Sequence, residues 1–393
     1  MAVWWSVSSA SRRPSVALLI ETSNRYSREL VHGVRSFIQQ QPGGWAVHLT
    51  EQGRGDVPPP WLARWEGDGI IARIENRRIE SSIRRKGLPV VSVSASGLAT
   101  DLPTVISDSA IVGRLAAEHL IERGFRHFGY CGDARFAWSK SHGEHFQQTL
   151  AENGYGCSHF DTRRTDFADW KLEQRKLAAW LKSLPRPAGV MTCFDIRGQQ
   201  VLDVCKRLGL RVPDEIGVIG QHDDTLLCEL CDPPLSSVIP SPREAGYQAA
   251  ALLEKMMRRR KIAAGIYPIA PTGVATRQST DLVATDDPQL AEAMRFIRSR
   301  ALEGIRVGDI LKHVPMSRTL LERKFREHFD RSPYDMIQYL RNQEAKALLL
   351  NTELPVAEIA ERCGYISAEY FSADFKKHSG QSPSAFRASA RPR

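Results

Sequence analysis

The apolar residues of this chain change their spacing near residue 280, and this change limits the possible fold more than any other feature of the sequence. Before it, short β-rich runs alternate with amphipathic stretches. From Gln289 to Arg393 only helical spacing is found. The stretch between them, Asp281 to Pro288, is polar and ends in proline, which is typical of a linker. A chain of 393 residues is long enough for two or three domains, so we expect a boundary here.

The first part has the pattern of an α/β domain built on doubly wound parallel sheets. Its strands are apolar without clean alternation, so helices are expected on both faces. The region is too long for one small sheet. We therefore expect two lobes, centred on 15–125 and 126–240, with the chain returning to the first lobe after about residue 240. The candidate strands are Val16–Ile20, Ala46–Thr50, Gly69–Ala72, Pro89–Val93, His127–Cys131, Gly189–Cys193 and Ile216–Gly220.

Two stretches of the helical part share one plan. Val307–Phe329 and Val356–His378 each have a short helix, a tight turn and a second helix. Ser317 and Ser367 stand at the N-cap position of the second helices and are 50 residues apart. A helix from Tyr334 to Leu350 is expected to bridge the two units. The sequence therefore predicts two helix-turn-helix units, 307–329 and 356–378, within an all-α domain at 289–393.

Each second helix buries one stripe and leaves a polar stripe free. Two such helices about 34 Å apart could enter successive major grooves of double-stranded DNA. Residues 289–393 carry 18 Lys and Arg against 13 Asp and Glu, which favours a polyanionic partner. The alternative is a helical bundle with solvated charged faces. The candidate DNA-contacting residues are Arg318, Thr319, Glu322, Arg323, Arg326, Ala368, Glu369, Ser372, Ala373 and Lys376.

Three segments of this part carry a family resemblance: SRTLLERKF from Ser317, RNQEAKALL from Arg341, and the run from Ile359 to Arg387. They resemble the AraC/XylS family of regulators, over about a quarter of the chain. Leu311 and Pro315 depart from the family, which often has alanine and glycine there. The resemblance implies a transcription regulator that binds promoter or operator DNA. Activation through RNA polymerase is the usual mode in that family, and repression is the alternative.

The first part resembles the sugar-sensing core of the LacI/GalR family, in the segments Asp68–Ala72, Ser107–Gly124, Val212–Asp224 and Pro233–Val238. This resemblance implies a two-lobed, periplasmic-binding-protein-like sensor over 15–280, a homodimer and a small sugar effector. The combination of this sensor with this DNA-binding end resembles known regulators of pentose use, so a pentose, with xylose first, is the implied effector. Another sugar is the alternative.

On the family pattern, loops at strand ends supply the sugar site. Carboxylates could take hydroxyl groups, and an indole could stack on the sugar ring. The alternatives are helix caps for the aspartates and core packing for Trp138. Relatives usually have aspartate where this chain has His222 and arginine where it has His142. The candidate sugar-binding residues are Tyr26, Arg73, Asp108, Trp138, His142, Asp195, Asp223 and Asp224.

Other functions lack their sequence signals. No G-x-G-x-x-G turn follows the first strand and no P-loop is found, which argues against an enzyme. No apolar run approaches the roughly 18 residues of a membrane span, and the N-terminus is a poor export signal, which argues against a transport receptor. The lone Cys228-x-x-Cys231 has no second pair, so neither a metal nor a cofactor is expected. We expect a cytoplasmic protein with a disordered tail at 1–14 and a linker at 281–288.

Overall fold

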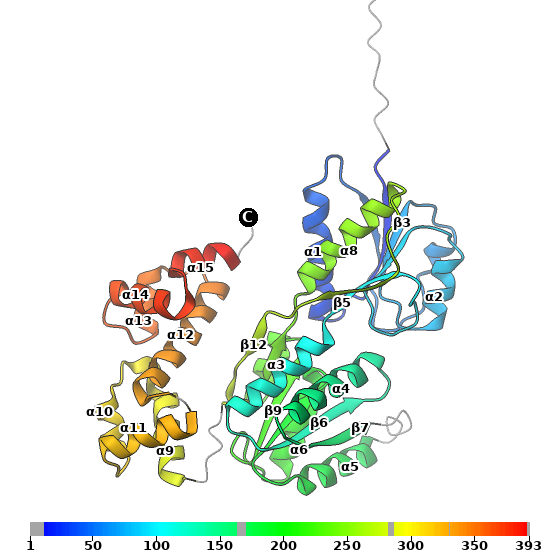
Figure 1. The fold of residues 1–393 in the computed structure, drawn as a ribbon. Helices are drawn as coiled ribbons and strands as arrows, with labels where there is room; N and C mark the ends of the chain where they lie inside the picture. The colour runs from blue at the N-terminus through cyan, green and yellow to red at the C-terminus, as the bar shows by residue number, and fades with distance from the viewer. Residues whose placement is uncertain (1–11, 163–169, 282–286, 330, 391–393) are drawn as a thin grey trace, which may run out of the picture. The chain divides into compact units, whose positions relative to one another are not determined.

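The computed structural model describes residues 12–162, 170–281, 287–329 and 331–390 (Figure 1). The chain divides into two compact units: one runs to Leu282, apart from residues 122–124, and the other begins at Val283. Residues 1–11 of the expected tail and 282–286 of the expected linker lie outside the described residues. None of the described helices is both long and apolar enough to span a membrane.

The first lobe of the larger unit is a six-stranded parallel sheet in the order β11-β5-β4-β3-β1-β2. Alternate residues of β1 point to opposite faces: Val16 and Leu18 pack with helices α1 and α8, and Ala17 and Leu19 pack toward α2. Its elements are β1 (Ser15–Leu19), α1 (Arg25–Gln39), β2 (Ala46–Leu49), η1 (Pro60–Ala63), β3 (Gly69–Ala72), α2 (Arg77–Arg84), β4 (Val90–Ser92), β5 (Pro103–Ser107), α8 (Pro242–Met257) and β11 (Gly265–Ile269).

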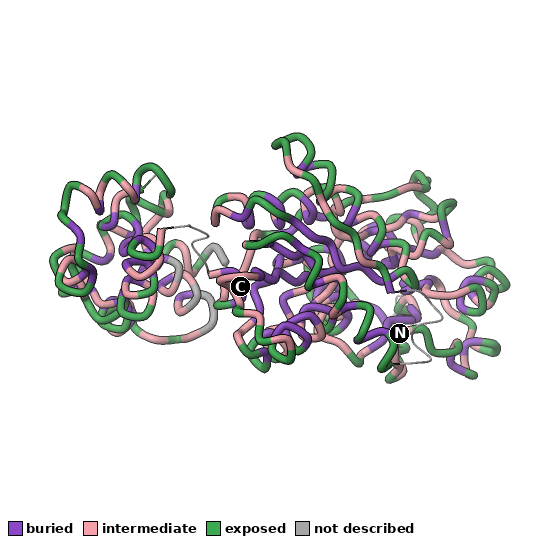
Figure 2. The backbone as a smooth tube through the Cα atoms, turned by 90° about the horizontal axis from the view of Figure 1, so that it is seen from below, coloured by how far each residue is buried: buried purple, intermediate pink, exposed green. Residues whose placement is uncertain are grey.

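The second lobe is another six-stranded sheet, ordered β12-β10-β9-β8-β6-β7, in which only β12 is antiparallel to its neighbour. Figure 2 shows buried residues concentrated along the strands of the larger unit. The elements are α3 (Ser109–Glu122), β6 (His127–Asp133), α4 (Ala137–Glu152), β7 (Cys157–Thr162), α5 (Trp170–Ser183), β8 (Ala188–Thr192), α6 (Asp195–Arg207), β9 (Ile216–Gln221), α7 (Thr225–Leu230), β10 (Ser236–Ile239), β12 (Gly273–Ala275) and η3 (Gln278–Thr280).

The chain crosses between the lobes three times, after β5, after β10 and after β11. The second crossing carries α8 and β11 back to the first lobe, as the sequence predicts. The third crossing was not predicted: it returns the chain to the second lobe, where β12 pairs with β10. The last described residues before the second unit therefore belong to the second lobe.

The smaller unit is all helical in its described residues, and its two cores share one helix. Met336 and Ile337 of α12 pack in the first core, while Ala345 and Leu349 of the same helix pack in the second. The elements are α9 (Pro288–Arg300), η4 (Ala301–Glu303), α10 (Val307–His313), α11 (Arg318–Phe329), α12 (Pro333–Asn351), α13 (Val356–Arg362), α14 (Ala368–Ser379) and α15 (Pro383–Ala390). The predicted fold class, a two-lobed α/β part followed by tandem helix-turn-helix units, is confirmed.

Candidate functional sites

Aromatic rings gather where the two lobes meet. Tyr26 on α1 of the first lobe lies 5.1 Å from the ring of His222, which follows β9 of the second. Trp138 lies 5.9 Å from the same ring and stacks on Phe136 at 5.0 Å. The guanidinium of Arg54, from the first lobe, lies 5.2 Å from the ring of Phe136 and 5.8 Å from that of Trp138. This junction between the lobes, here called the cleft, therefore combines aromatic rings from both lobes with the cation of Arg54.

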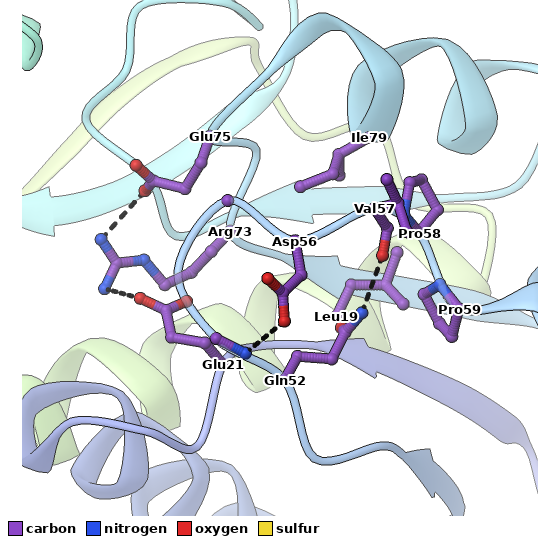
Figure 3. Close-up of a pocket in the computed structure, with 12 residues that line it drawn as sticks. Leu19, Glu21, Gln52, Asp56, Val57, Pro58, Pro59, Arg73, Glu75 and Ile79 are labelled. Atoms are coloured by element: carbon purple, nitrogen blue, oxygen red, sulfur yellow. Dashed lines mark hydrogen bonds and ion pairs between the residues drawn. The ribbon is translucent and has the colours of Figure 1, made fainter. Parts of the chain in front are cut away.

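A buried charge cluster forms the first-lobe wall of this region (Figure 3). Arg73 lies 3.0 Å from a carboxylate oxygen of Glu21 and 3.0 Å from one of Glu75, and Arg54 lies 3.7 Å from Glu21. Burial by itself would raise the pKa of Glu75, but Arg73 and the hydroxyl of Ser94 lower it, so the carboxylate stays charged. The cluster borders a small, open pocket that is lined also by residues of the 52–59 loop.

Several buried polar atoms of these residues have no hydrogen-bond partner among the described residues. They are His142 Nδ1, Gln221 Oε1 and Arg73 Nε, whereas Arg54 Nε has only its 3.7 Å ion pair with Glu21. His142 is only 4% exposed, and burial lowers its pKa to about 4, so its ring is neutral at pH 7. An unpaired buried polar atom is costly, which favours a polar ligand that would bind these atoms.

The predicted aspartates are placed differently from one another. Asp108 caps α3, since its carboxylate accepts hydrogen bonds from the amides of Ala110 and Ile111 at 2.9 and 3.2 Å. Asp195 is buried and accepts from the hydroxyl of Ser237 and the amide of Asp224. Burial raises the pKa of Asp195 to about 7. Asp108 therefore has the capping role of the alternative, whereas Asp195 lies within α6, caps no helix, and holds the loop after β9 through the amide of Asp224.

The loop after β9 has an unusual backbone. His222 and Asp223 have φ angles of 108° and 47°, which side chains other than glycine rarely adopt. Two side chains hold this loop in place. The carboxylate of Asp195 accepts from the amide of Asp224, and the hydroxyl of Ser237 accepts from the amide of Asp223 at 3.0 Å. Asp223 itself pairs with Arg277, while no side-chain hydrogen bond of Asp224 is found at the start of α7.

Helices α11 and α14, the second helices of the two helix-turn-helix units, are the recognition helices. They carry the predicted polar stripes. Ser317 and Ser367 accept the amides of Leu320 and Tyr370, both at 3.2 Å, so both predicted N-caps are present. None of the ten candidate DNA-contacting residues is buried. On α11 these residues include an ion pair, Arg318 to Glu322 at 3.0 Å. The polar stripes are therefore accessible within the smaller unit.

Sequence reasoning missed four cleft residues: Glu21, Arg54, Phe136 and Gln221. Glu21 lies two residues after the end of β1, and Gln221 is the last residue of β9, so their positions at strand ends were a usable signal. Phe136 stands just before the helix that carries Trp138, whereas Arg54 lies on a distant loop that no local spacing relates to Trp138.

Three known protein domains match this chain in successive segments. They are the XylR N-terminal domain over residues 15–106, the periplasmic binding protein-like domain over 117–280, and a helix-turn-helix domain over 310–389. The sensor fold also occurs in the cellobiose complex of the transcriptional regulator CelR, with 20% identity and a TM-score of 0.55 over 68% of this chain and 85% of that one.

A two-lobed sensor joined to a tandem helix-turn-helix domain defines a DNA-binding transcription regulator. Over 384 residues the chain is 32% identical to the xylose operon regulatory protein of Escherichia coli K12, covering 96% of this chain and 97% of that one. The Haemophilus influenzae protein of that name is 31% identical over 379 residues, 95% of this chain and 97% of the relative. A solved structure of the xylose-binding transcription activator xylR covers 97% of this chain and 100% of its own, with 30% identity and a TM-score of 0.65. The chain belongs to the family of the xylose operon regulatory proteins, and both family resemblances are confirmed.

Proposed function

We propose that this regulator binds a pentose, with D-xylose first, in the cleft between its lobes and activates genes for the use of that sugar. The observation that carries the proposal is the group of unpartnered buried polar atoms beside the aromatic rings of the cleft. A sugar offers hydroxyl groups to the former and C–H faces to the latter. The names of the relatives make xylose the first candidate.

Within the cleft we assign contacts by geometry. Trp138 and Tyr26 supply ring faces, His142 and Arg73 supply hydrogen bonds, and Arg54 closes the site from the first lobe. The neutral ring of His142 can donate or accept, which suits a hydroxyl group. Asp223 and Asp224 contribute through the loop that carries His222, and Asp108 and Asp195 support the site by fixing backbone.

On the DNA side, the exposed stripes of α11 and α14 enter successive major grooves, and both contact bases and phosphates. The protein acts as a homodimer in the cytoplasm, and RNA polymerase is the partner that the activated promoter engages. To be an effector, the sugar must bind one arrangement of the dimer more tightly than the other.

Calorimetry of the full-length protein against xylose, arabinose, ribose and glucose tests the sensor. We expect xylose to bind most tightly, with a change in tryptophan fluorescence because Trp138 lies in the cleft. Trp138→Leu should weaken binding at least tenfold, whereas Trp180→Leu, outside the cleft on α5, should leave the affinity unchanged. Equal binding of all four sugars, or of none, would refute a pentose sensor.

Fluorescence anisotropy with promoter DNA upstream of the pentose-use genes tests the regulator. We expect the DNA affinity to change with xylose, and a reporter gene to rise when xylose is added. In cells that lack the protein, an activator leaves the reporter low even with xylose, whereas a repressor of the same architecture leaves it high without xylose.

A further inference from the structure

One arginine connects the cleft to the point where the chain leaves the sensor. Arg277 follows β12 and precedes η3, the last element before the linker. Its guanidinium lies 2.8 Å from Oδ1 of Asp223 and donates to the carbonyl of Leu235 at 3.0 Å. The side chain is 16% exposed, so solvent competes little for these contacts.

The other side of Asp223 faces the first lobe. Arg25, on α1, donates to the carbonyl oxygen of Asp223 and to the hydroxyl of Thr225, the latter at 3.0 Å. A guanidinium nitrogen of Arg25 also lies 4.0 Å from the second carboxylate oxygen of Asp223. Asp223 thus stands between an arginine of each lobe, on a backbone with positive φ that its neighbours hold in place. Any change in how the lobes meet changes the environment of this carboxylate.

From Arg277 the contacts continue into a fully buried group of hydroxyls. The hydroxyl of Ser236 accepts the amide of Arg277 and donates to its carbonyl, both at 2.8 Å, and Thr280 donates to it at 2.6 Å. The hydroxyl of Ser279 accepts the amide of Ser236 and donates to the carbonyl of Val218. Ser236, Ser279 and Thr280 are 0% exposed.

His119 of α3 completes this group through a 2.7 Å hydrogen bond between its Nε2 and the hydroxyl of Thr280. The residues that end the sensor are therefore tied to strands β9 and β10 and to α3 by directional bonds. The backbone of Arg277 is bonded to Ser236, directly before η3. If Arg277 moves when Asp223 shifts, these hydrogen bonds must therefore strain or re-form.

We propose that Arg277 is a positioning residue that couples the lobe contact at Asp223 to the segment leading to the DNA-binding domain. This rests on the proposed function, because the signal it carries is sugar binding in the cleft. Arg277 touches none of the residues to which direct sugar contacts are assigned, and it pairs with Asp223, which acts through the loop that carries His222. Its removal should therefore separate sugar binding from the DNA response.

The test measures the sugar affinity and the DNA affinity, with and without saturating xylose, for the full-length wild type and Arg277→Met. The ratio of the two DNA affinities is the coupling, and it must equal the effect of DNA on sugar affinity. We expect Arg277→Met to bind xylose within about threefold of wild type while its coupling ratio falls toward one. Thr280→Val, which keeps the shape of the side chain and removes the hydroxyl, should lower the same ratio in a protein that stays folded.

Lys206→Met provides a control, because Lys206 pairs with Asp232 on the surface of the same lobe and should leave the ratio unchanged. A wild-type coupling ratio retained in both Arg277→Met and Thr280→Val would overturn the inference alone. A lower thermal midpoint and weaker sugar binding at an unchanged ratio would show that Arg277 is merely structural. If no pentose changes the DNA affinity of the wild type, the proposed function fails and the inference fails with it.

Discussion

The two helix-turn-helix units have the same plan but carry different side chains at matching positions. Counted from the capping serines, α11 presents Arg, Thr, Glu, Arg and Arg where α14 presents Ala, Glu, Ser, Ala and Lys. Long cations can reach phosphates and guanine edges, whereas small side chains allow a close approach of the helix to the DNA. The first unit is therefore suited to charge-based contacts and the second to contacts that depend on fit.

The two units are also anchored differently. Seven residues after its cap, α11 has Lys324, which pairs with Asp287 at the N-cap of α9, next to the linker. The matching residue of α14 is Asp374, which accepts from Asn342 of α12 at 3.0 Å and from Tyr365 at 2.8 Å. The first recognition helix is thus tied to the linker side of the domain and the second to the bridging helix.

The largest expected effect tests whether the units are independent. Phe325 and Phe375 stand eight residues after the caps and are both 0% exposed. Replacing either by alanine should cost about 3–5 kcal/mol of stability. Because α12 belongs to both cores, we expect each change to speed hydrogen exchange in both units. Ile366→Ala, at an 89% exposed position, is the control, and faster exchange in the mutated unit alone would show two separate folding units.

Asp374→Ala should cost about 1–3 kcal/mol, since it leaves the buried hydroxyl of Tyr365 without its acceptor. Asp374→Asn retains an acceptor oxygen and should cost less. The measurement is the thermal midpoint of the full-length protein, followed by hydrogen exchange of α14. If alanine and asparagine behave alike, the contacts of Asp374 do not fix the second recognition helix.

Arg323 and Ala373 occupy matching positions in the two units, so each can be replaced by the residue found in the other. Arg323→Ala should weaken specific DNA binding by about 1–3 kcal/mol and relax sequence preference at one base pair, if the guanidinium contacts a base. Ala373→Arg should weaken binding of the second half-site through a steric clash. Anisotropy with single-base operator variants separates the cases, because a phosphate contact at Arg323 would lower affinity equally for all sequences.

The smallest expected effect is the pH dependence of the ion pair between Asp287 and Lys324. Partial burial would raise the pKa of Asp287, but the bonds from Lys324 and from the amides of Leu290 and Gln289 lower it overall. A lowered pKa stabilises the folded state above the ordinary value of about 3.9, and this stabilisation disappears as the pH falls through the folded value. Lys324→Met should therefore cost at most about 1 kcal/mol near pH 7, with the difference from wild type shrinking below about pH 4. Hydrogen exchange of α11 at both pH values measures it, and a constant difference would contradict the ion pair.

The sequence predicted the strands of both sheets that are apolar on both faces, because burial on two sides leaves a continuous apolar run. It did not predict β7, β11 and β12, whose residues are largely exposed or half-buried at sheet edges and so lack that run. It also did not predict β10, which is buried but begins with two serines. The position of Trp138 where the lobes meet follows from its place in the helix after strand β6. The ion pair of Asp223 with Arg277 joins residues 54 apart in the chain, and no local pattern indicates it.

By itself, the sequence determined the helical period, the capping serines and the alternation of strand and helix, since these depend on interactions within a few residues. It also determined the family, through motifs that are local in the same sense. Only the tertiary structure decided which aspartates face the cleft and which hold backbone, and which polar atoms remain unpaired there. Those properties depend on side chains that long loops bring together, and the energy of such contacts is set by packing rather than by neighbours in the chain.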